Sequence, residues 1–193
     1  MKVLVRGGSI SAGIGIIDSY IEILKRNIAF CNIEFINKSE VNATTFDCIE
    51  TFYSDIDLIK PDILMLHFGI DDAYFPVYRS EFKENLVQSI RLARIRFNPE
   101  IILLTSHPFD NQYDMDMINI YYRTIREVAL DLKCHLLPIH TYWWGFLYEN
   151  QKNIHDYIQT DCRYPNEKGH MLYADAIIPI LTRIIKNLSE EKY

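Results

Sequence analysis

Short runs of hydrophobic residues alternate along this chain with longer segments in which hydrophobic residues recur every three or four positions. Residues 62–67 (DILMLH) form an almost continuous apolar run, which is typical of a strand buried on both faces of a sheet. Ile16, Tyr20 and Ile23 follow a helical period instead. The two patterns predict strands at Lys2–Arg6, Ile33–Ile36, Asp62–His67, Ile101–Thr105 and Cys134–Ile139, and helices at Ala12–Phe30, Thr44–Ile59, Arg79–Phe97, Asp116–Leu132 and Glu167–Leu188.

Regular alternation of strands and helices predicts an α/β fold, a three-layer sandwich with a five-stranded parallel sheet between helices. The 193 residues fit a single domain, 1–193, because no repeat, linker or low-complexity tract interrupts the pattern. Ligands of such folds bind at the carboxyl ends of the strands. The residues expected at those ends are Gly7, Gly8, Ser9, Asn37, Gly69, Ile70, Asp71, Asp72, Ser106, His107 and His140.

Composition and charge argue against several classes of protein. Hydrophobic residues make up 49% of the chain, which is enough for a sizeable core. The net charge of -6 argues against a nucleic-acid or anionic membrane partner. No apolar run approaches the roughly 20 residues of a membrane span, and MKVLVRGG is too short for a signal peptide. The four cysteines form no C-x-x-C pair, so we expect free thiols, no zinc site and a cytoplasmic location.

The segment VRGGSISAG, Val5 to Gly13, marks the turn from the first strand into the first helix. It is not a phosphate loop, because Ile14 stands where that motif needs lysine. It matches a dinucleotide fingerprint poorly, because Ile10 stands at the second glycine. In a third interpretation the turn presents Ser9 as a nucleophile, with its own N–H and the helix N-terminus ready to stabilise an oxyanion. The alternative is a small residue that suits a tight turn and an N-cap, and this stretch alone leaves both open.

Four segments together resemble the SGNH, or GDSL, hydrolase family. GGSISAG is similar to the family's first block, G-D-S-[IL]-[ST]-x-G, and PDILMLHFGIDDA (61–73) is similar to its third, a buried strand that ends in G-x-N-D. EIILLTSHP (100–108) resembles the strand and loop that follow. DCRYPNEKGHMLYADAI (161–177) resembles the last block, D-x-x-H-P-N-x-x-G-[HY], which opens the final helix. The blocks occur in family order over nearly the whole chain, so the resemblance implies the flavodoxin-like SGNH-hydrolase fold.

The resemblance also implies roles for individual residues. Ser9 matches the serine nucleophile, and Gly8 stands where the family has aspartate. Asn42 is the nearest match to the glycine of the second block, whose N–H serves the oxyanion hole. Asparagine keeps that backbone donor and tolerates an unusual φ. Gly69 belongs to the third block, beside the oxyanion-binding position.

Two positions depart from the family's catalytic set. Asp71 replaces an asparagine whose amide donates to the oxyanion; an ionised carboxylate only accepts, which reverses a contribution of roughly 3 kcal/mol. A protonated Asp71 could still donate if burial or the neighbouring Asp72 raised its pKa. Asp161 matches the family's aspartate, but Tyr164 replaces its histidine, and a phenol with a pKa of about 10 is a poor base at neutral pH. The set is therefore degenerate, because the base that should activate Ser9 is missing.

Other histidines stand where a relocated base could be. His107 follows the fourth predicted strand and is the first candidate, whereas His140 and His155 are weaker ones. A loop or capping role explains each of the three equally simply. We expect His67, inside a buried strand, to be a core residue and His170, in the closing helix, to be structural.

Aromatic residues concentrate in Thr141–Ile158, between the fifth strand and the final loop. A short helix packed on the edge of the sheet explains them. The alternative is a stacking wall for a sugar or an apolar group, or a partner surface.

Two functions remain open from the sequence. In the first, the protein is hydrolase-like with weak or no ordinary esterase activity and binds a small acylated or sugar-like ligand. In the second, it is an active serine esterase or acyltransferase on a small O-acylated substrate, with Ser9 as nucleophile and a relocated base. The changes at Gly8, Asp71 and Tyr164 favour the first. Neither function implies a metal or a cofactor, and the sequence does not predict the oligomeric state.

Overall fold

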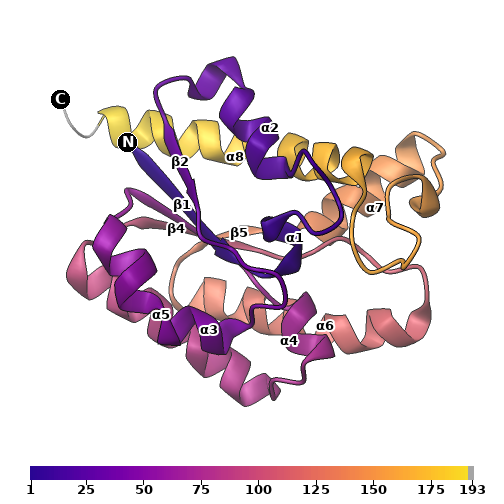
Figure 1. Ribbon diagram of the computed structural model, residues 1–193, viewed down its shortest axis with the longest axis horizontal. Coiled ribbons are helices and arrows are strands. Elements are labelled where there is room, and N and C mark those ends of the chain that lie inside the picture. Colours follow the sequence, from indigo (N-terminus) through magenta and orange to yellow (C-terminus); the bar gives the residue numbers. More distant parts are fainter. Residues whose placement is uncertain (191–193) are drawn as a thin grey trace.

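A five-stranded sheet forms the middle layer of the computed structural model, which describes residues 1–190 (Figure 1). The strand order is β2-β1-β3-β4-β5 and all four pairings are parallel. This is the flavodoxin-like order, whose topological switch point lies between β1 and β3. The predicted fold class is therefore confirmed. The strands are β1 (Lys2–Gly7), β2 (Glu34–Asn37), β3 (Ile63–His67), β4 (Glu100–Leu104) and β5 (His135–Leu137).

Helices cover both faces of the sheet. The helices α2 and α8 pack together on one face, and α3, α5 and α6 pack together on the other (Figure 1). The α-helices are α1 (Ser9–Ala12), α2 (Tyr20–Arg26), α3 (Thr45–Glu50), α4 (Ile70–Tyr74), α5 (Arg79–Arg96), α6 (Gln112–Asp131), α7 (Ile139–Glu149) and α8 (Glu167–Glu190). Two 3-10 turns, η1 (Ile28–Phe30) and η3 (Ile154–Asp156), and a π-helical turn, η2 (Phe52–Asp57), complete the described elements.

The inner strands explain the unbroken apolar runs of the sequence. Every residue of β3 is buried, as are four of the five residues of β4. Both strands have helices on their two sides, so neither face can carry polar residues cheaply. The three central residues of β1, Val3, Leu4 and Val5, are fully buried as well.

The prediction of one continuous helix over Ala12–Phe30 is wrong. Helix α1 ends at Ala12, and the rest of the range contains two separate elements, α2 and η1. Gly13 and Gly15 have φ of 79° and 73°, a left-handed conformation that glycine adopts freely and that ends a helix. Ser19 then caps α2 by accepting a hydrogen bond from the N–H of Glu22. The hydrophobic period continued across the break and concealed it.

Of the helices α4 and α7, only α4 was not predicted at all. The first has only five residues, and the second lies in the aromatic segment for which a short helix was one of the two explanations. Thr44 is the N-cap of α3, with Asp47 completing a capping box. The predicted helix Thr44–Ile59 nevertheless continues after α3 as the π-helical turn η2.

Candidate active site

Ser9 lies at the carboxyl end of β1, at the switch point of the sheet. Its hydroxyl donates to Oδ1 of Asp71 (2.7 Å) and accepts from the N–H of Asn42 (2.9 Å). Its own N–H donates to Oδ2 of Asp71 (2.7 Å). Ser9 is fully buried and Asp71 is 4% exposed. One carboxylate therefore engages both the hydroxyl proton of Ser9 and the Ser9 N–H that was expected to stabilise an oxyanion.

Gly8 and Asp71 are linked sterically. A Cβ atom on Gly8 would lie 1.9 Å from Oδ2 of Asp71 and 2.7 Å from the carbonyl oxygen of Ala43. The carboxylate of Asp71 thus occupies the space that a side chain at position 8 would need. The absence of a side chain at Gly8 and the position of the Asp71 carboxylate therefore depend on each other.

The two neighbouring carboxylates have different surroundings. Burial raises the pKa of Asp71, while the hydrogen bonds from Ser9 lower it. Asp72, which we expected as a contributor to that shift, is instead tied to Thr45 N–H (2.8 Å), Thr45 Oγ1 (2.7 Å) and Gly69 N–H (2.9 Å). Burial raises its own pKa to about 6. Asp72 therefore joins the beginnings of α3 and α4, and the Gly69 N–H is committed to it.

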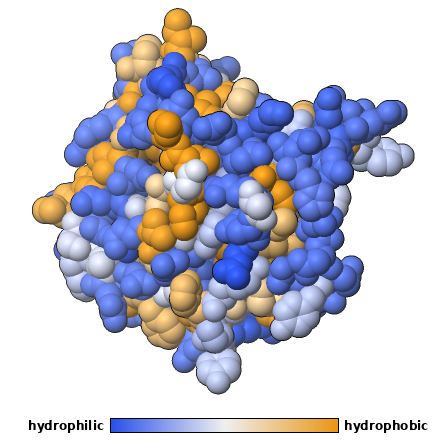
Figure 2. Space-filling model, turned by 45° about the vertical axis from the view of Figure 1, so that its right-hand side comes forward, coloured by the Kyte–Doolittle hydropathy of each residue, from blue (hydrophilic) through white to orange (hydrophobic). Residues whose placement is uncertain are grey.

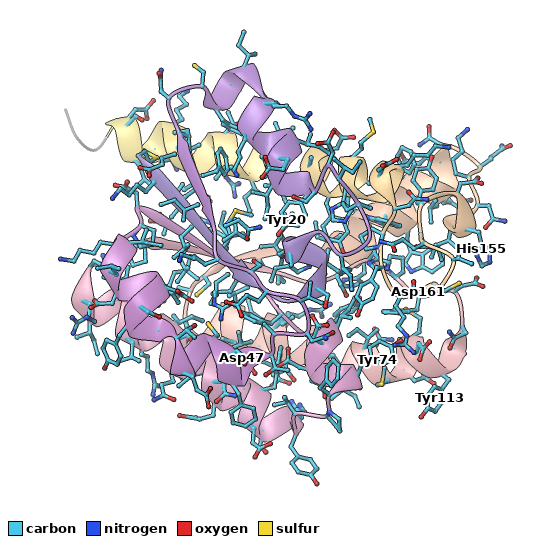
Figure 3. The ribbon with its side chains drawn as sticks, viewed as in Figure 1. Tyr20, Asp47, Tyr74, Tyr113, His155 and Asp161 are labelled. Atoms are coloured by element: carbon cyan, nitrogen blue, oxygen red, sulfur yellow. The ribbon has the colours of Figure 1, made fainter. Side chains whose placement is uncertain are left out.

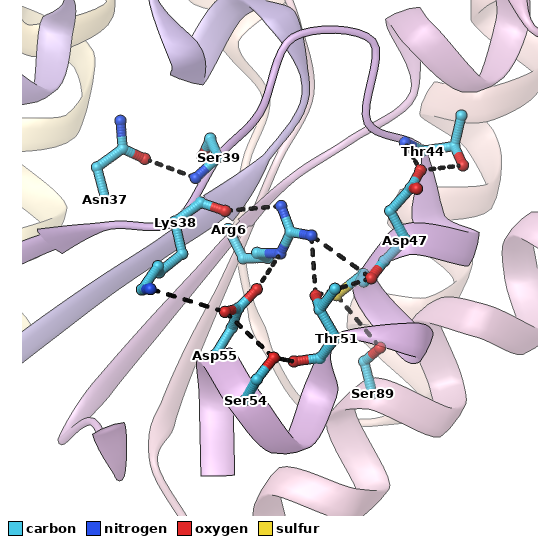
Figure 4. Close-up of polar contacts among 11 residues, drawn as sticks. Arg6, Asn37, Lys38, Ser39, Thr44, Asp47, Thr51, Ser54, Asp55 and Ser89 are labelled. Carbon is cyan, nitrogen blue, oxygen red and sulfur yellow. Dashed lines mark hydrogen bonds and ion pairs between the residues drawn. The ribbon is translucent and has the colours of Figure 1, made fainter. Parts of the chain in front are cut away.

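The loop that carries Asn42 is held by a buried guanidinium (Figure 4). Asn42 has φ of 65°, the unusual backbone that asparagine was expected to tolerate. Arg6, fully buried in β1, donates to the carbonyl of Lys38 (2.6 Å) and to Oγ1 of Thr51 (2.9 Å), and pairs with Asp55 (3.4 Å). These contacts join β1 to the loop after β2, to the C-cap of α3 and to η2. They fix the loop whose N–H reaches Ser9.

The closing loop before α8 brings Tyr164 to Ser9. Tyr164 is 8% exposed; burial raises its pKa, a hydrogen bond with Ser9 lowers it, and Asp71 raises it further. Asp161 lies in the same loop, near the right-hand end of the view in Figure 3, and is exposed. Its Oδ1 accepts the N–H of Arg163 (3.1 Å). The phenol of Tyr164 therefore lies next to Ser9, as its place in the last family-like segment led us to expect.

His107, the first candidate for a relocated base, contacts Tyr173 and not Ser9. It is fully buried, its N–H donates to the Tyr173 hydroxyl (2.7 Å), and its Nδ1 lies 3.0 Å from the same oxygen. Burial lowers its pKa to about 3. Because the side chain after β4 turns into the core, its place at a strand end did not bring it to the site.

The other candidate histidines are also engaged elsewhere. Nδ1 of His140 lies 2.8 Å from Oγ1 of Thr105. His155 is exposed and pairs with Asp110 (3.1 Å) at the right-hand edge of Figure 3. Within residues 1–190, no hydrogen bond joins an imidazole to Ser9.

A buried polar cluster beside the serine turn was missed at the sequence level. Oγ of Ser11 lies 2.8 Å from Nδ1 of His67 and 2.8 Å from the hydroxyl of Tyr20. His170 accepts the N–H of Tyr20 (3.0 Å), which agrees with its expected structural role. Ser11 belongs to the GGSISAG segment, but its hydroxyl contacts His67 at the end of β3. The spacing of residues in the sequence does not indicate a contact between segments so far apart.

The aromatic segment is divided between core and surface. Trp143 of α7 is fully buried against His107 and Tyr173. Trp144 (46% exposed) and Tyr148 (87% exposed) face solvent. For Trp143, packing on the sheet edge is the correct explanation.

Two general features bear on the kind of site. In the part of the chain that the structure describes, no three His, Cys, Asp or Glu side chains come together as a metal site. No described helix is both long and apolar enough to cross a membrane.

A doubly wound α/β sheet with a serine after β1, an N–H donor on the next loop and a closing loop over both has the architecture of a serine hydrolase. The chain belongs to the GDSL-like Lipase/Acylhydrolase family, whose model matches residues 6–172. No curated protein matches it in sequence.

Solved structures show the same fold at low identity. An alpha/beta hydrolase enzyme from the metagenome of Lake Arreo, Spain, is 21% identical, with a TM-score of 0.79 over 92% of this chain and 93% of that one. An acetylxylan esterase from Geobacillus stearothermophilus is 21% identical (TM-score 0.78, 92% of each chain). A lipase/acylhydrolase from Enterococcus faecalis is 19% identical (TM-score 0.79, 94% and 95%). At these identities the likeness is one of fold.

Proposed function

We propose that this GDSL-family protein has little or no ordinary esterase activity and that its crevice recognises a small acylated or sugar-like ligand. The hydrogen bonding of Ser9 is the observation that carries the first part. A serine hydroxyl becomes a nucleophile when a positioned base takes its proton. Here the acceptor is Asp71, whose other oxygen is bound to the Ser9 N–H.

Charge adds a second obstacle to ester hydrolysis. An ionised Asp71 repels an oxyanion that develops on the acyl group, where the family places an amide donor. Tyr164 lies next to Ser9 and supplies a phenol whose pKa is raised by burial. At neutral pH this phenol keeps its proton, so Tyr164 cannot act as the base that takes the proton of Ser9.

The ligand part of the proposal rests on aromatic side chains that follow Asp71 in the chain and on the family. The guanidinium of Arg163, next to Tyr164, lies 4.7 Å from the ring centre of Tyr74, and Phe75 is 51% exposed. An exposed aromatic face such as that of Phe75 can stack on a sugar ring or an acyl group, whereas Arg163 already lies over the ring of Tyr74. Figure 2, which brings the right-hand side of Figure 1 forward, shows a largely hydrophilic face crossed by a band of hydrophobic side chains. A structural relative is an acetylxylan esterase, which makes an acetylated sugar the first ligand to test.

A second candidate is an active esterase or acyltransferase in which Asp71, rather than a histidine, is the relocated base. The 2.7 Å contact from Ser9 Oγ and the raised pKa of Asp71 favour it. Asp71 would take the hydroxyl proton as Oγ attacks the acyl carbon, and the neutral carboxyl would then be able to donate to the oxyanion.

Ester hydrolysis separates the two candidates. We expect the unmodified protein to hydrolyse p-nitrophenyl acetate and acetylated xylose no faster than Ser9→Ala. A rate above that of Ser9→Ala which Asp71→Asn abolishes would favour the second candidate and contradict the first. Titration of acetylated xylose into 15N-labelled protein should shift the amide signals of Asn42 and Tyr164. Unchanged signals would contradict the ligand assignment.

Restoring the missing groups should restore the reaction. Tyr164→His combined with Asp71→Asn is expected to raise hydrolysis by about 100-fold or more, because a positioned base and an oxyanion donor each contribute at least that order. Tyr164→Phe with Asp71→Asn is the matched control and should give no gain. Adding Ser9→Ala to the active pair should return the rate to background. No gain in the active pair would contradict the claim that these two groups limit the reaction.

A further inference from the structure

A small cavity lies beside the serine turn, with polar groups on three of its walls. About 10 Å³ of it is open to the centre of a water-sized sphere. His67 from the end of β3, Asp71 from α4 and Ser106 after β4 line it, together with apolar Ile10 and Ile70. A cavity of this size and polarity has room for one water molecule.

His67 presents an unpartnered nitrogen in this region. It is 4% exposed, and among the described residues its Nε2 has no hydrogen-bond partner. Its Nδ1 lies 2.8 Å from Oγ of Ser11 and 3.2 Å from the hydroxyl of Tyr20. If Nδ1 of His67 is the acceptor, the Tyr20 hydroxyl donates to Oγ of Ser11 and the Ser11 hydroxyl donates to Nδ1. Both hydroxyl protons then have an acceptor. The proton of the neutral imidazole is then on Nε2, on the ring edge opposite the two hydroxyls.

Ser106 presents an acceptor to the same cavity. Its Oγ lies 2.6 Å from the hydroxyl of Tyr122, which donates its single proton to the carbonyl of His107 (2.6 Å). Ser106 must therefore be the donor in its contact with Tyr122. Its oxygen keeps a lone pair for another donor.

We propose that the cavity binds one ordered water molecule that accepts from Nε2–H of His67 and donates to the carboxylate of Asp71 and to Oγ of Ser106. Three hydrogen bonds are the usual number for a buried water. The water removes the cost of an unpartnered buried imidazole N–H. It also completes a hydrogen-bonded chain from Ser9 through Asp71 to His67 on the far side of the cavity.

This hydration site has a consequence for Asp71. A water that donates to a carboxylate favours the ionised form. It therefore opposes the burial that raises the pKa of Asp71, and it keeps the side chain an acceptor of the Ser9 proton. The hydration site goes beyond the proposed function, and the hydrolysis measurements neither support nor contradict it.

A crystal structure of the unmodified protein tests the water directly. We expect electron density for one water within about 3 Å of both Nε2 of His67 and an oxygen of Asp71. A cavity without density, or a water that contacts neither atom, would overturn the proposal. No substitution is needed, so a folding defect cannot confuse this result.

Titration of Asp71 by carboxyl 13C NMR tests the consequence. His67→Phe keeps the ring shape but removes the donor to the water, and we expect the pKa of Asp71 to rise by about one unit, the equivalent of one lost hydrogen bond to a charged group. His107→Phe removes another buried imidazole that does not line the cavity and should leave that pKa unchanged. An unchanged pKa in His67→Phe, or equal shifts in both variants, would contradict the proposal. The hydrolysis rate relative to Ser9→Ala stays a separate readout for the proposed function.

Discussion

At the scale of single residues, the carboxylate of Asp71 occupies the space that a side chain at Gly8 would need. The sequence showed both substitutions but not their connection, because the 1.9 Å approach depends on how the Asp71 side chain is turned. Ser9, Asn42 and Tyr164, which the family-like segments singled out, lie together in the structure, and their roles stay a prediction. The inward turn of His107 was beyond it, since a strand-end position does not determine which way the following side chain points.

Gly8→Ala should be strongly destabilising. The added Cβ collides with both Asp71 and the Ala43 carbonyl, and overpacking of this kind costs about 1–3 kcal/mol. Gly145→Ala is the matched control, because a Cβ there meets nothing within 4 Å and alanine favours the helix. Urea denaturation of the two variants measures the difference. Equal unfolding free energies would show that the region around Gly8 accommodates a side chain.

Gln159 holds the elements of the site together. Its Nε2 donates to the carbonyls of Ile14 (2.8 Å) and Pro165 (3.0 Å), and its N–H donates to the carbonyl of Tyr164 (2.8 Å). The turn after α1 is thereby tied to the closing loop. We therefore expect the Gln159 hydrogen bonds to keep Tyr164 next to Ser9.

Gln159→Leu should loosen the closing loop. Loss of two side-chain hydrogen bonds of about 1 kcal/mol each should speed amide exchange in residues 160–166 by about tenfold or more. Gln112→Leu changes an exposed glutamine on α6 and serves as the control. Hydrogen–deuterium exchange followed by mass spectrometry gives the rates. Unchanged exchange in residues 160–166 would mean that other contacts hold the loop.

At the scale of elements, the strands were predicted well and the short helices poorly. β3 and β4 lie between two helix layers, so their sequences are apolar throughout and easy to identify. The break after α1 was missed because Gly13 and Gly15 sit inside a continuing hydrophobic period. The five-residue helix α4 is too short to show a period at all.

At the scale of the whole molecule, the stability of the fold depends on a cluster in which three buried histidines surround Tyr173. Ring centres of His67, His107 and His170 lie 5.4, 6.2 and 6.0 Å from that of Tyr173. Burial lowers the pKa of each from 6.5 to about 3. The folded protein therefore holds all three neutral at pH values where the unfolded chain protonates them.

Acid should destabilise the fold from about pH 6.5 downwards. Between pH 6.5 and about pH 3 the unfolded chain binds more protons, so each of the three histidines removes up to about 1.4 kcal/mol per pH unit. Asp71 and Asp72, whose pKa values are raised by burial, act in the opposite direction but are outnumbered by the three histidines. Urea denaturation between about pH 7.5 and about pH 5 measures the slope.

Substitution of single histidines checks the origin of that slope. His170→Gln keeps an acceptor for the Tyr20 N–H and should flatten the pH dependence, whereas His155→Gln, at an exposed position, should not. Stability that is constant down to pH 5, or equal slopes in the two variants, would contradict the account.

Labelling of Ser9 by a fluorophosphonate tests most directly whether this serine is idle. The reagent forms a covalent adduct with serine only when a base activates the hydroxyl and an oxyanion donor is at hand. We expect intact-mass and peptide analysis to find no adduct on Ser9 of the unmodified protein, and an adduct on Ser9 in Tyr164→His with Asp71→Asn. Stoichiometric labelling of Ser9 in the unmodified protein would contradict the account.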